Sequence, residues 1–281
     1  MELIKSCEIL DNKTKQLEEF YIERLEYENK LEDALSDKKI AVLTGFPGVG
    51  KTQIVLNYIN KHRGKYKKIF FVNSKSYLSL LKGYSKFLDL NEDISSRFKA
   101  KKWFEKNENW LLVYDEMDTD EVKGFFESGH IVNSNNGDVI ITSSLNSWKN
   151  KIEVSCFNIN ESILFLSNLT GLNDLDLNRK LSVMLGNYPI ALKLAANYIN
   201  KNLIDFDEFI SKLDKTDFKI LDLENCLNKE FHNMIDITTH VFSIIFNKIE
   251  EFNLINYLGV FSYFSNDYIN KDLFEIIYER Y

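Results

Sequence analysis

The 281-residue chain has little cysteine, histidine, proline and glycine, and these scarcities exclude several kinds of protein. Its 3 Cys and 4 His are scattered, so the sequence has neither a disulfide framework nor the spacing of a metal site. No apolar run approaches the roughly 18 residues that cross a bilayer, and the first residues lack the apolar segment of a secretion signal. We therefore expect a cytoplasmic protein without a membrane segment.

Composition is that of a folded globular protein. Hydrophobic residues make up 44% and charged residues 27%, which is close to average and excludes general disorder. The net charge of −7 speaks against nucleic acid as the main partner, because phosphate backbones favour basic surfaces.

The 11 Gly and 2 Pro are unevenly placed, since three Gly and one Pro fall within residues 45–52. Elsewhere, apolar runs alternate with helical periodicity. The runs predict buried strands at 40–44, 69–72, 110–114 and 139–142, and a weaker strand at 153–157. The periodicity predicts helices at 13–36, from Thr52 to about Lys61, and over 76–108 with a break near 91–93. Such alternation is typical of an α/β domain with a doubly wound, parallel sheet, here of five strands.

The strand pattern stops after residue 160. Residues 161–215 have the pattern of several short helices, and residues 231–281 are helical again and rich in Phe, Tyr and Ile. We therefore expect an α/β domain with an N-terminal helical segment at 1–158, a small helical domain at 159–215 and a third unit at 216–281.

The strongest motif is the glycine-rich loop at 45–52. It matches G-x-x-x-x-G-K-[ST], follows a buried strand and opens a helix. Glycines let backbone N–H groups surround a phosphate, and the helix N-terminus adds its positive end. The catalytic Lys51 would bind the β- and γ-phosphates, and Thr52 would bind Mg²⁺. The complete loop is Gly45, Phe46, Pro47, Gly48, Val49, Gly50, Lys51 and Thr52.

Two strand ends supply further candidates. Asp115 ends the third strand, at the edge where ligands bind in parallel sheets, and would hold Mg²⁺ through water. Glu116 would orient or deprotonate the attacking water, although the pair could also simply begin a polar loop. Thr142 and Ser143 end the fourth strand, where their hydroxyls would reach the γ-phosphate or only cap the strand end.

In combination with a Gly-x-x-Pro-x-Ala-Leu segment at 186–192, these motifs resemble the NB-ARC domain of the STAND class of P-loop ATPases. Gln53 and residues 62–66 look like the bacterial, repeat-fused branch. The resemblance implies that ATP or ADP is the ligand, that Pro189 packs against the adenine, and that Gln53 belongs to the binding loop. It also implies that the strand at 139–142 lies between the P-loop strand and the Asp115 strand, so that Thr142 and Ser143 face the γ-phosphate.

Three departures from the family matter. Ile22 and Arg24 match an upstream segment that contacts the nucleotide, but Glu23 stands where the family has glycine. Ser144 stands where the family commonly has an arginine that senses the γ-phosphate, and its loss should slow hydrolysis. Residues 216–281 resemble only the start of the family's winged-helix domain.

The function implied is a switch in which ADP holds the domains closed and ATP exchange opens them for oligomerisation, with slow hydrolysis as the reset. One alternative is an active ATPase of the AAA+ kind, which the Asp115-Glu116 pair favours. Another is a non-catalytic, ADP-bound interaction module. A GTPase is disfavoured because the nearest guanine-recognition motif, at 247–250, lies in a helical region. The aromatic segment 242–281 would bind a partner protein or a second copy, or simply form a core.

Overall fold

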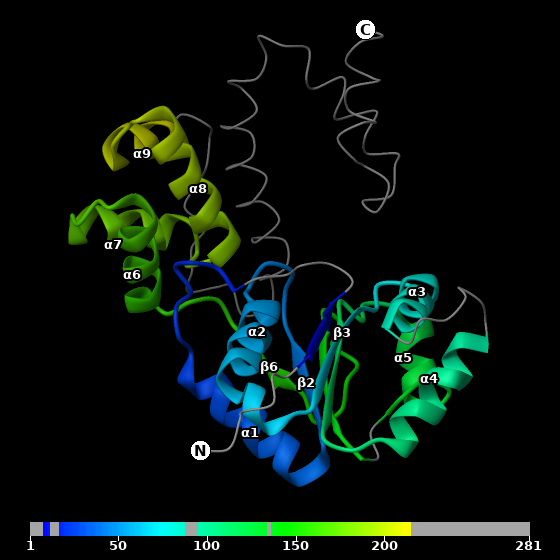
Figure 1. The fold of residues 1–281 in the computed structure, drawn as a ribbon. Helices are drawn as coiled ribbons and strands as arrows, with labels where there is room; N and C mark the ends of the chain where they lie inside the picture. The colour runs from blue at the N-terminus through cyan, green and yellow to red at the C-terminus, as the bar shows by residue number, and fades with distance from the viewer. Residues whose placement is uncertain (1–7, 12–16, 88–94, 134–135, 215–281) are drawn as a thin grey trace, which may run out of the picture.

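The computed structural model describes residues 8–11, 17–87, 95–133 and 136–214. Within these ranges the centre is a six-stranded parallel sheet in the order β1-β3-β4-β5-β2-β6 (Figure 1). Its strands are β1 (Glu8–Asp11), β2 (Ile40–Thr44), β3 (Lys68–Asn73), β4 (Trp110–Asp115), β5 (Asp138–Ser143) and β6 (Ile152–Glu153). The α/β prediction is confirmed, and β5 lies between β2 and β4 as expected. The edge strand β1 is a sixth strand that the sequence analysis missed.

Helices cover both faces of the sheet because successive strand residues point to opposite sides. Ile69 and Phe71 of β3 enter one hydrophobic core, and Phe70 and Val72 enter the other. The first core lies under α1 (Leu25–Lys38) and α2 (Lys51–His62), and a 3₁₀ turn, η1 (Arg63–Lys65), follows α2. The second core lies under α3 (Tyr77–Phe87), α4 (Ser95–Lys106) and α5 (Asp120–Glu127).

A group of short helices follows the sheet. Its members are α6 (Ile159–Thr170), α7 (Leu175–Met184), α8 (Pro189–Asn202) and α9 (Phe206–Asp214). Their buried residues belong to the same core as those of α1 and α2, so these helices pack on that side of the molecule. The expected third unit at 216–281 and its aromatic segment lie outside the described residues.

The predicted helix at 13–36 is wrong at its start, because α1 begins only at Leu25. Residues 17–24 instead form a non-helical strap across neighbouring elements. The backbone N–H of Glu18 donates to Oε1 of Gln53 in α2 over 2.9 Å, and the Glu18 carboxylate pairs with Lys193 in α8 over 2.6 Å. These distant contacts override the local helical periodicity.

Two smaller corrections concern the second half of the sheet. The predicted strand at 153–157 is much shorter, since β6 ends at Glu153. The backbone carbonyls of Ser155 and Cys156 are bound by a side chain instead of by a strand. Helix α5 was not predicted, although Thr119 caps its N-terminus by accepting a hydrogen bond from the Val122 N–H.

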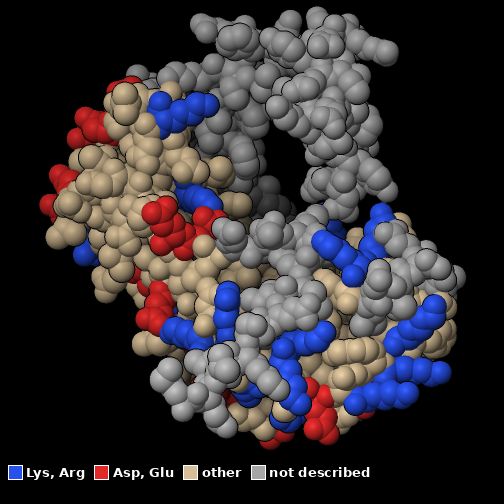
Figure 2. Space-filling model, in the orientation of Figure 1, with Lys and Arg blue, Asp and Glu red and all other residues tan. Residues whose placement is uncertain are grey.

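Charge is distributed unevenly over the surface. Figure 2 shows Lys and Arg gathered on the side of α4, whereas most of the visible Asp and Glu lie on the side of α6–α9. The described residues between 61 and 106 include 13 Lys or Arg and a single acidic residue, Glu105. The acidic character of the whole chain therefore does not extend to this stretch of the sequence. In the described part of the chain, no helix has both the length and the apolar content needed to cross a membrane.

Candidate functional site

The glycine-rich loop joins β2 to α2, and all three of its glycines have positive φ, with a Cβ added at Gly45 clashing with the Val154 carbonyl oxygen. Gly48 and Gly50 have φ angles of 87° and 98°, in the region that side chains disfavour. A Cβ added to Gly48 would lie 2.7 Å from Cγ2 of Ile190 in α8. The loop therefore lies directly against the helical domain.

Lys51, the first residue of α2, closes back over the loop. Its Nζ donates hydrogen bonds to the backbone carbonyl oxygens of Gly45, over 2.7 Å, and Phe46, over 2.9 Å. Burial lowers the pKa of Lys51, and nearby carboxylates, that of Asp118 foremost, act in the opposite direction. The ammonium group is thus held within the ring of backbone that would surround a phosphate.

Three side chains from three elements meet beside the loop. Thr52 of α2 donates from Oγ1 to Oδ1 of Asp115 over 2.8 Å, and Thr142 of β5 donates to the same oxygen over 2.7 Å. Asp115 is completely buried at the end of β4. Hydroxyl and carboxylate oxygens are the hard donors that Mg²⁺ prefers, so the side chains of Thr52 and Asp115 fit the predicted metal.

Glu116 lies next to this group in a strained backbone conformation, with φ of 60°. Its backbone N–H donates to Oγ1 of Thr142 over 3.0 Å, and its Oε2 accepts from Nδ2 of Asn73 over 3.4 Å. These contacts fix both ends of the residue at the edge of the sheet, where its carboxylate lines the cavity described below.

Ser143 is placed differently from the prediction. It is fully buried, and its hydroxyl donates to the Met117 carbonyl over 2.6 Å. Side chains alternate along a strand, so adjacent Thr142 and Ser143 cannot both face the same site. The Ser143 hydroxyl does not line the cavity, and its contact with the γ-phosphate stays a prediction that this geometry does not favour.

A cavity of about 490 Å³ lies between the loop, the strap, the strand ends and the helical domain, within the size range of ligand pockets. Part of its lining is apolar and aromatic: Tyr21, Ile22, Phe157, Phe165, Pro189 and Ile190. Another part is polar: Lys51, Thr52, Lys75, Glu116, Asp118 and Thr142. An aromatic part beside a phosphate-binding loop matches the two halves of a nucleotide.

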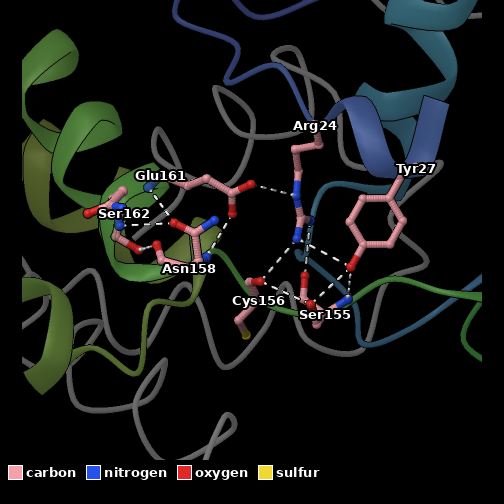
Figure 3. Close-up of polar contacts among 8 residues, drawn as sticks. Arg24, Tyr27, Ser155, Cys156, Asn158, Glu161 and Ser162 are labelled. Carbon is pink, nitrogen blue, oxygen red and sulfur yellow. Dashed lines mark hydrogen bonds and ion pairs between the residues drawn. The ribbon is translucent and has the colours of Figure 1, made fainter. Parts of the chain in front are cut away.

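Arg24 also lines the cavity, but its two Nη groups donate to other parts of the chain (Figure 3). Its Nη1 and Nη2 donate to the carbonyl oxygens of Ser155 and Cys156 over 3.0 and 3.1 Å. Its Nε lies 3.6 Å from Oε1 of Glu161 in α6, and its guanidinium lies over the Tyr27 ring at 4.4 Å. Arg24 thus binds the linker between β6 and α6 as well as α6 itself.

Tyr188 and Pro189 bring α8 onto the loop. The Tyr188 hydroxyl donates to the backbone carbonyl of Pro47. Burial raises the pKa of Tyr188 to about 12, so the hydroxyl stays a neutral donor near pH 7. Pro189 is the first residue of α8, where its fixed φ suits the helix, and it is buried.

Most of the predicted site residues converge. Those that line the cavity are Ile22, Arg24, Pro47, Gly48, Val49, Gly50, Lys51, Thr52, Gln53, Glu116, Thr142 and Pro189. Gly45, Phe46, Asp115 and Ser143 do not line it. Sequence reasoning missed Tyr188 and Lys75. Tyr188 adjoins the Pro189 motif and Lys75 lies just beyond a predicted strand end, and those positions were the available signals.

The order of the parallel strands and the glycine-rich loop between β2 and α2 give the chain the fold of the P-loop NTPases. Among solved structures, the Walker-type ATPase PABY2304 of Pyrococcus abyssi matches with a TM-score of 0.55 and 15% identity, over 74% of this chain and 75% of that chain. A STAND protein with a tetratricopeptide repeat sensor from Pyrococcus horikoshii matches with a TM-score of 0.47 and 15% identity, over 69% and 31%. Cdc6p from Pyrobaculum aerophilum matches with a TM-score of 0.43 and 14% identity, over 68% and 66%. No protein-family model and no curated protein matches the chain.

Proposed function

We propose that this chain is an ATP- and ADP-binding switch of the NB-ARC and STAND kind. The supporting observation is that one cavity is lined both by the loop of the α/β domain and by Pro189, Ile190 and Lys193 of α8. A nucleotide there would contact both domains at once. Whether ADP or ATP is bound can therefore change the free-energy difference between the closed and the open arrangement, as a population shift requires.

The residues present have the chemistry that the nucleotide needs. Lys51 and the loop N–H groups would bind the phosphates, and the apolar part of the cavity would bind the base. Thr52 and Asp115 would hold Mg²⁺, which when bound neutralises charge on the phosphates. ADP would stabilise the contact between the loop and α8, and exchange of ADP for ATP would break that contact.

Hydrolysis would serve to reset the switch. Glu116, which lines the cavity, would orient a water and accept its proton. Asn73 and Thr142 hold this residue at its side chain and at its backbone N–H. We expect turnover well below about 1 per second, because a switch needs a long-lived triphosphate state.

The first experiment denatures the purified protein and quantifies the released nucleotide. Close to one ADP per chain supports the switch in its closed state. Calorimetric titration with ADP and ATP then compares the wild type with Lys51→Ala, and with Lys82→Ala as a control at an exposed lysine of α3 outside the cavity. Unchanged affinity in Lys51→Ala would refute nucleotide binding at this loop.

The active ATPase remains the second candidate, because the Asp115-Glu116 pair stands beside the loop. Turnover above about 1 per second that falls at least tenfold in Glu116→Gln would favour it. ADP that neither exchanges nor turns over would favour the non-catalytic module. Light scattering after size-exclusion chromatography, with ADP or with a non-hydrolysable ATP analogue, tests nucleotide-dependent oligomerisation.

A further inference from the structure

Four cationic side chains line the cavity, and three of them already have acceptors. Arg24 binds the linker carbonyls, Lys51 binds the loop carbonyls, and Lys193 pairs with Glu18. The fourth is Lys75, which is exposed, and its ammonium group has no hydrogen-bond or ion-pair partner among the described residues. Lys75 is therefore the one cation lining the cavity whose side chain has no acceptor among the described residues.

The backbone of Lys75 is fixed at the polar part of the cavity. Its N–H donates to Oδ1 of Asn73 over 3.1 Å, and the same Asn73 side chain donates to Glu116 over 3.4 Å. The N–H of the preceding residue, Ser74, donates to the Asp115 carbonyl over 2.7 Å. The flexible side chain of Lys75 thus starts just after the end of β3, beside the end of β4 that carries Asp115 and Glu116.

Without Lys75, the side-chain charges at this part of the site, apart from the proposed Mg²⁺, oppose a third phosphate. The carboxylates of Asp115, Glu116 and Asp118 all act on Lys51, which is the other cation there. A triphosphate brings one more phosphoryl group and more negative charge than a diphosphate. An additional mobile ammonium can offset that repulsion, and lysine supplies such a point charge on a flexible stem.

We propose that Lys75 is a specificity-determining residue that lets this site distinguish a nucleoside triphosphate from a diphosphate. The inference rests on the proposed function and adds to it the element that reads the third phosphate. Lys75 contributes affinity for the triphosphate state and little for the diphosphate state. It therefore biases the switch toward its triphosphate form.

The test is calorimetric titration, with Mg²⁺, of ADP and of a non-hydrolysable ATP analogue. The proteins are the wild type, Lys75→Ala, Lys75→Gln, Lys75→Arg and the control Lys82→Ala. We expect both neutral variants to bind the analogue about tenfold more weakly, with ADP affinity changed less than about twofold, since one charge-assisted contact is lost. Lys75→Arg should retain most of the discrimination, and the difference should shrink in 0.5 M salt because the group is exposed.

The outcomes separate the two proposals. If the wild type binds neither nucleotide, or if Lys51→Ala binds as well as the wild type, the proposed function fails and this inference fails with it. If the wild type binds both, but the neutral variants weaken both nucleotides equally or neither of them, the inference alone is overturned. Thermal unfolding of each variant should match the wild type, since the Lys75 side chain is exposed.

Discussion

Tyr188, just before α8, donates a hydrogen bond to the backbone carbonyl of Pro47 in the phosphate-binding loop. The two residues are 141 positions apart, one in the loop after β2 and the other just before α8. The loop cannot change shape around a phosphate without affecting this contact. A change in the loop would therefore act on α8 through this neutral donor, beside the close approach of Gly48 to Ile190.

Replacing Tyr188 by Phe should accelerate ADP release about fivefold to tenfold, because one neutral hydrogen bond contributes about 1 kcal/mol. Stopped-flow displacement of a fluorescent ADP analogue measures the rate. Burial raises the pKa of Tyr188 to about 12, so the hydroxyl is protonated at both pH 7 and pH 9. The ratio of variant to wild-type rates should be the same at the two values, and a ratio that collapses at pH 9 would contradict a neutral donor.

Gly48 and Gly50 form a matched pair for testing the contact between loop and helical domain. Both have positive φ, so alanine should strain each by about 1 kcal/mol. An added Cβ at Gly48 would also crowd Ile190, whereas one at Gly50 would meet nothing within 4 Å. Urea unfolding should show Gly48→Ala to be less stable than Gly50→Ala by about 1 to 2 kcal/mol.

Truncating the crowded neighbour provides the control. In the Gly48→Ala background, Ile190→Ala should restore part of the lost free energy of unfolding. In the Gly50→Ala background, the same truncation should only destabilise. Equal losses for the two glycine variants would mean that the loop does not press on α8 in solution.

Asp115→Asn should remove the benefit of Mg²⁺ while leaving metal-free nucleotide binding nearly intact. The carboxylate accepts from both Thr52 and Thr142, and the amide keeps one oxygen for those hydroxyls but loses the charge that a divalent cation needs. ATP affinity with Mg²⁺ should fall at least about tenfold, which corresponds to roughly 1.4 kcal/mol. Titrations in MgCl₂ and in EDTA separate the two effects, and an equal loss in both would assign Asp115 a structural role only.

Local sequence patterns predicted the glycine-rich loop and the central strands, because both depend mainly on residues that are close together in the sequence. The loop is recognisable from sequence because the glycines, the lysine and the threonine that would bind one ligand all lie within residues 45–52. The central strands are recognisable because helices bury both of their faces, which requires continuous apolar runs. The alternation of side chains along β5 could also have separated Thr142 from Ser143, but the family resemblance assigned both residues to the phosphate.

The rest depends on contacts between distant residues. Residues 17–24 carry helical spacing, yet Glu18 meets Lys193, 175 residues away, and the segment forms no helix. Arg24 matches a nucleotide-contacting motif, yet carbonyls 131 and 132 residues away take its donors. Neither partner can be identified from spacing, because only the folded arrangement of α6 and α8 brings them near the strap.

Arg24 contributes to stability through its hydrogen bonds to the linker before α6. It is 6% exposed, and removing it takes the Nη1 donor from the Ser155 carbonyl and the Nη2 donor from the Cys156 carbonyl, which keeps only the weaker contact with the Ser155 hydroxyl at 3.2 Å. Arg24→Ala should lower the free energy of unfolding by about 2 to 4 kcal/mol, measured in urea. Arg24→Lys should fall in between, because an ammonium cannot reproduce the planar fork of donors.

Glu161→Gln separates the ion pair from the linker contacts. The carboxylate lies 3.6 Å from Nε of Arg24, and its other oxygen accepts from the N–H of Asn158 in the capping box of α6, a bond that glutamine can keep. We expect a loss of about 0 to 1 kcal/mol, as for a partly exposed pair. If Glu161→Gln destabilised the protein as much as Arg24→Ala, Arg24 would stabilise the protein through its ion pair with Glu161 and not through its hydrogen bonds to the linker. The two carbonyl contacts would then contribute nothing measurable to holding the helical domain against the sheet.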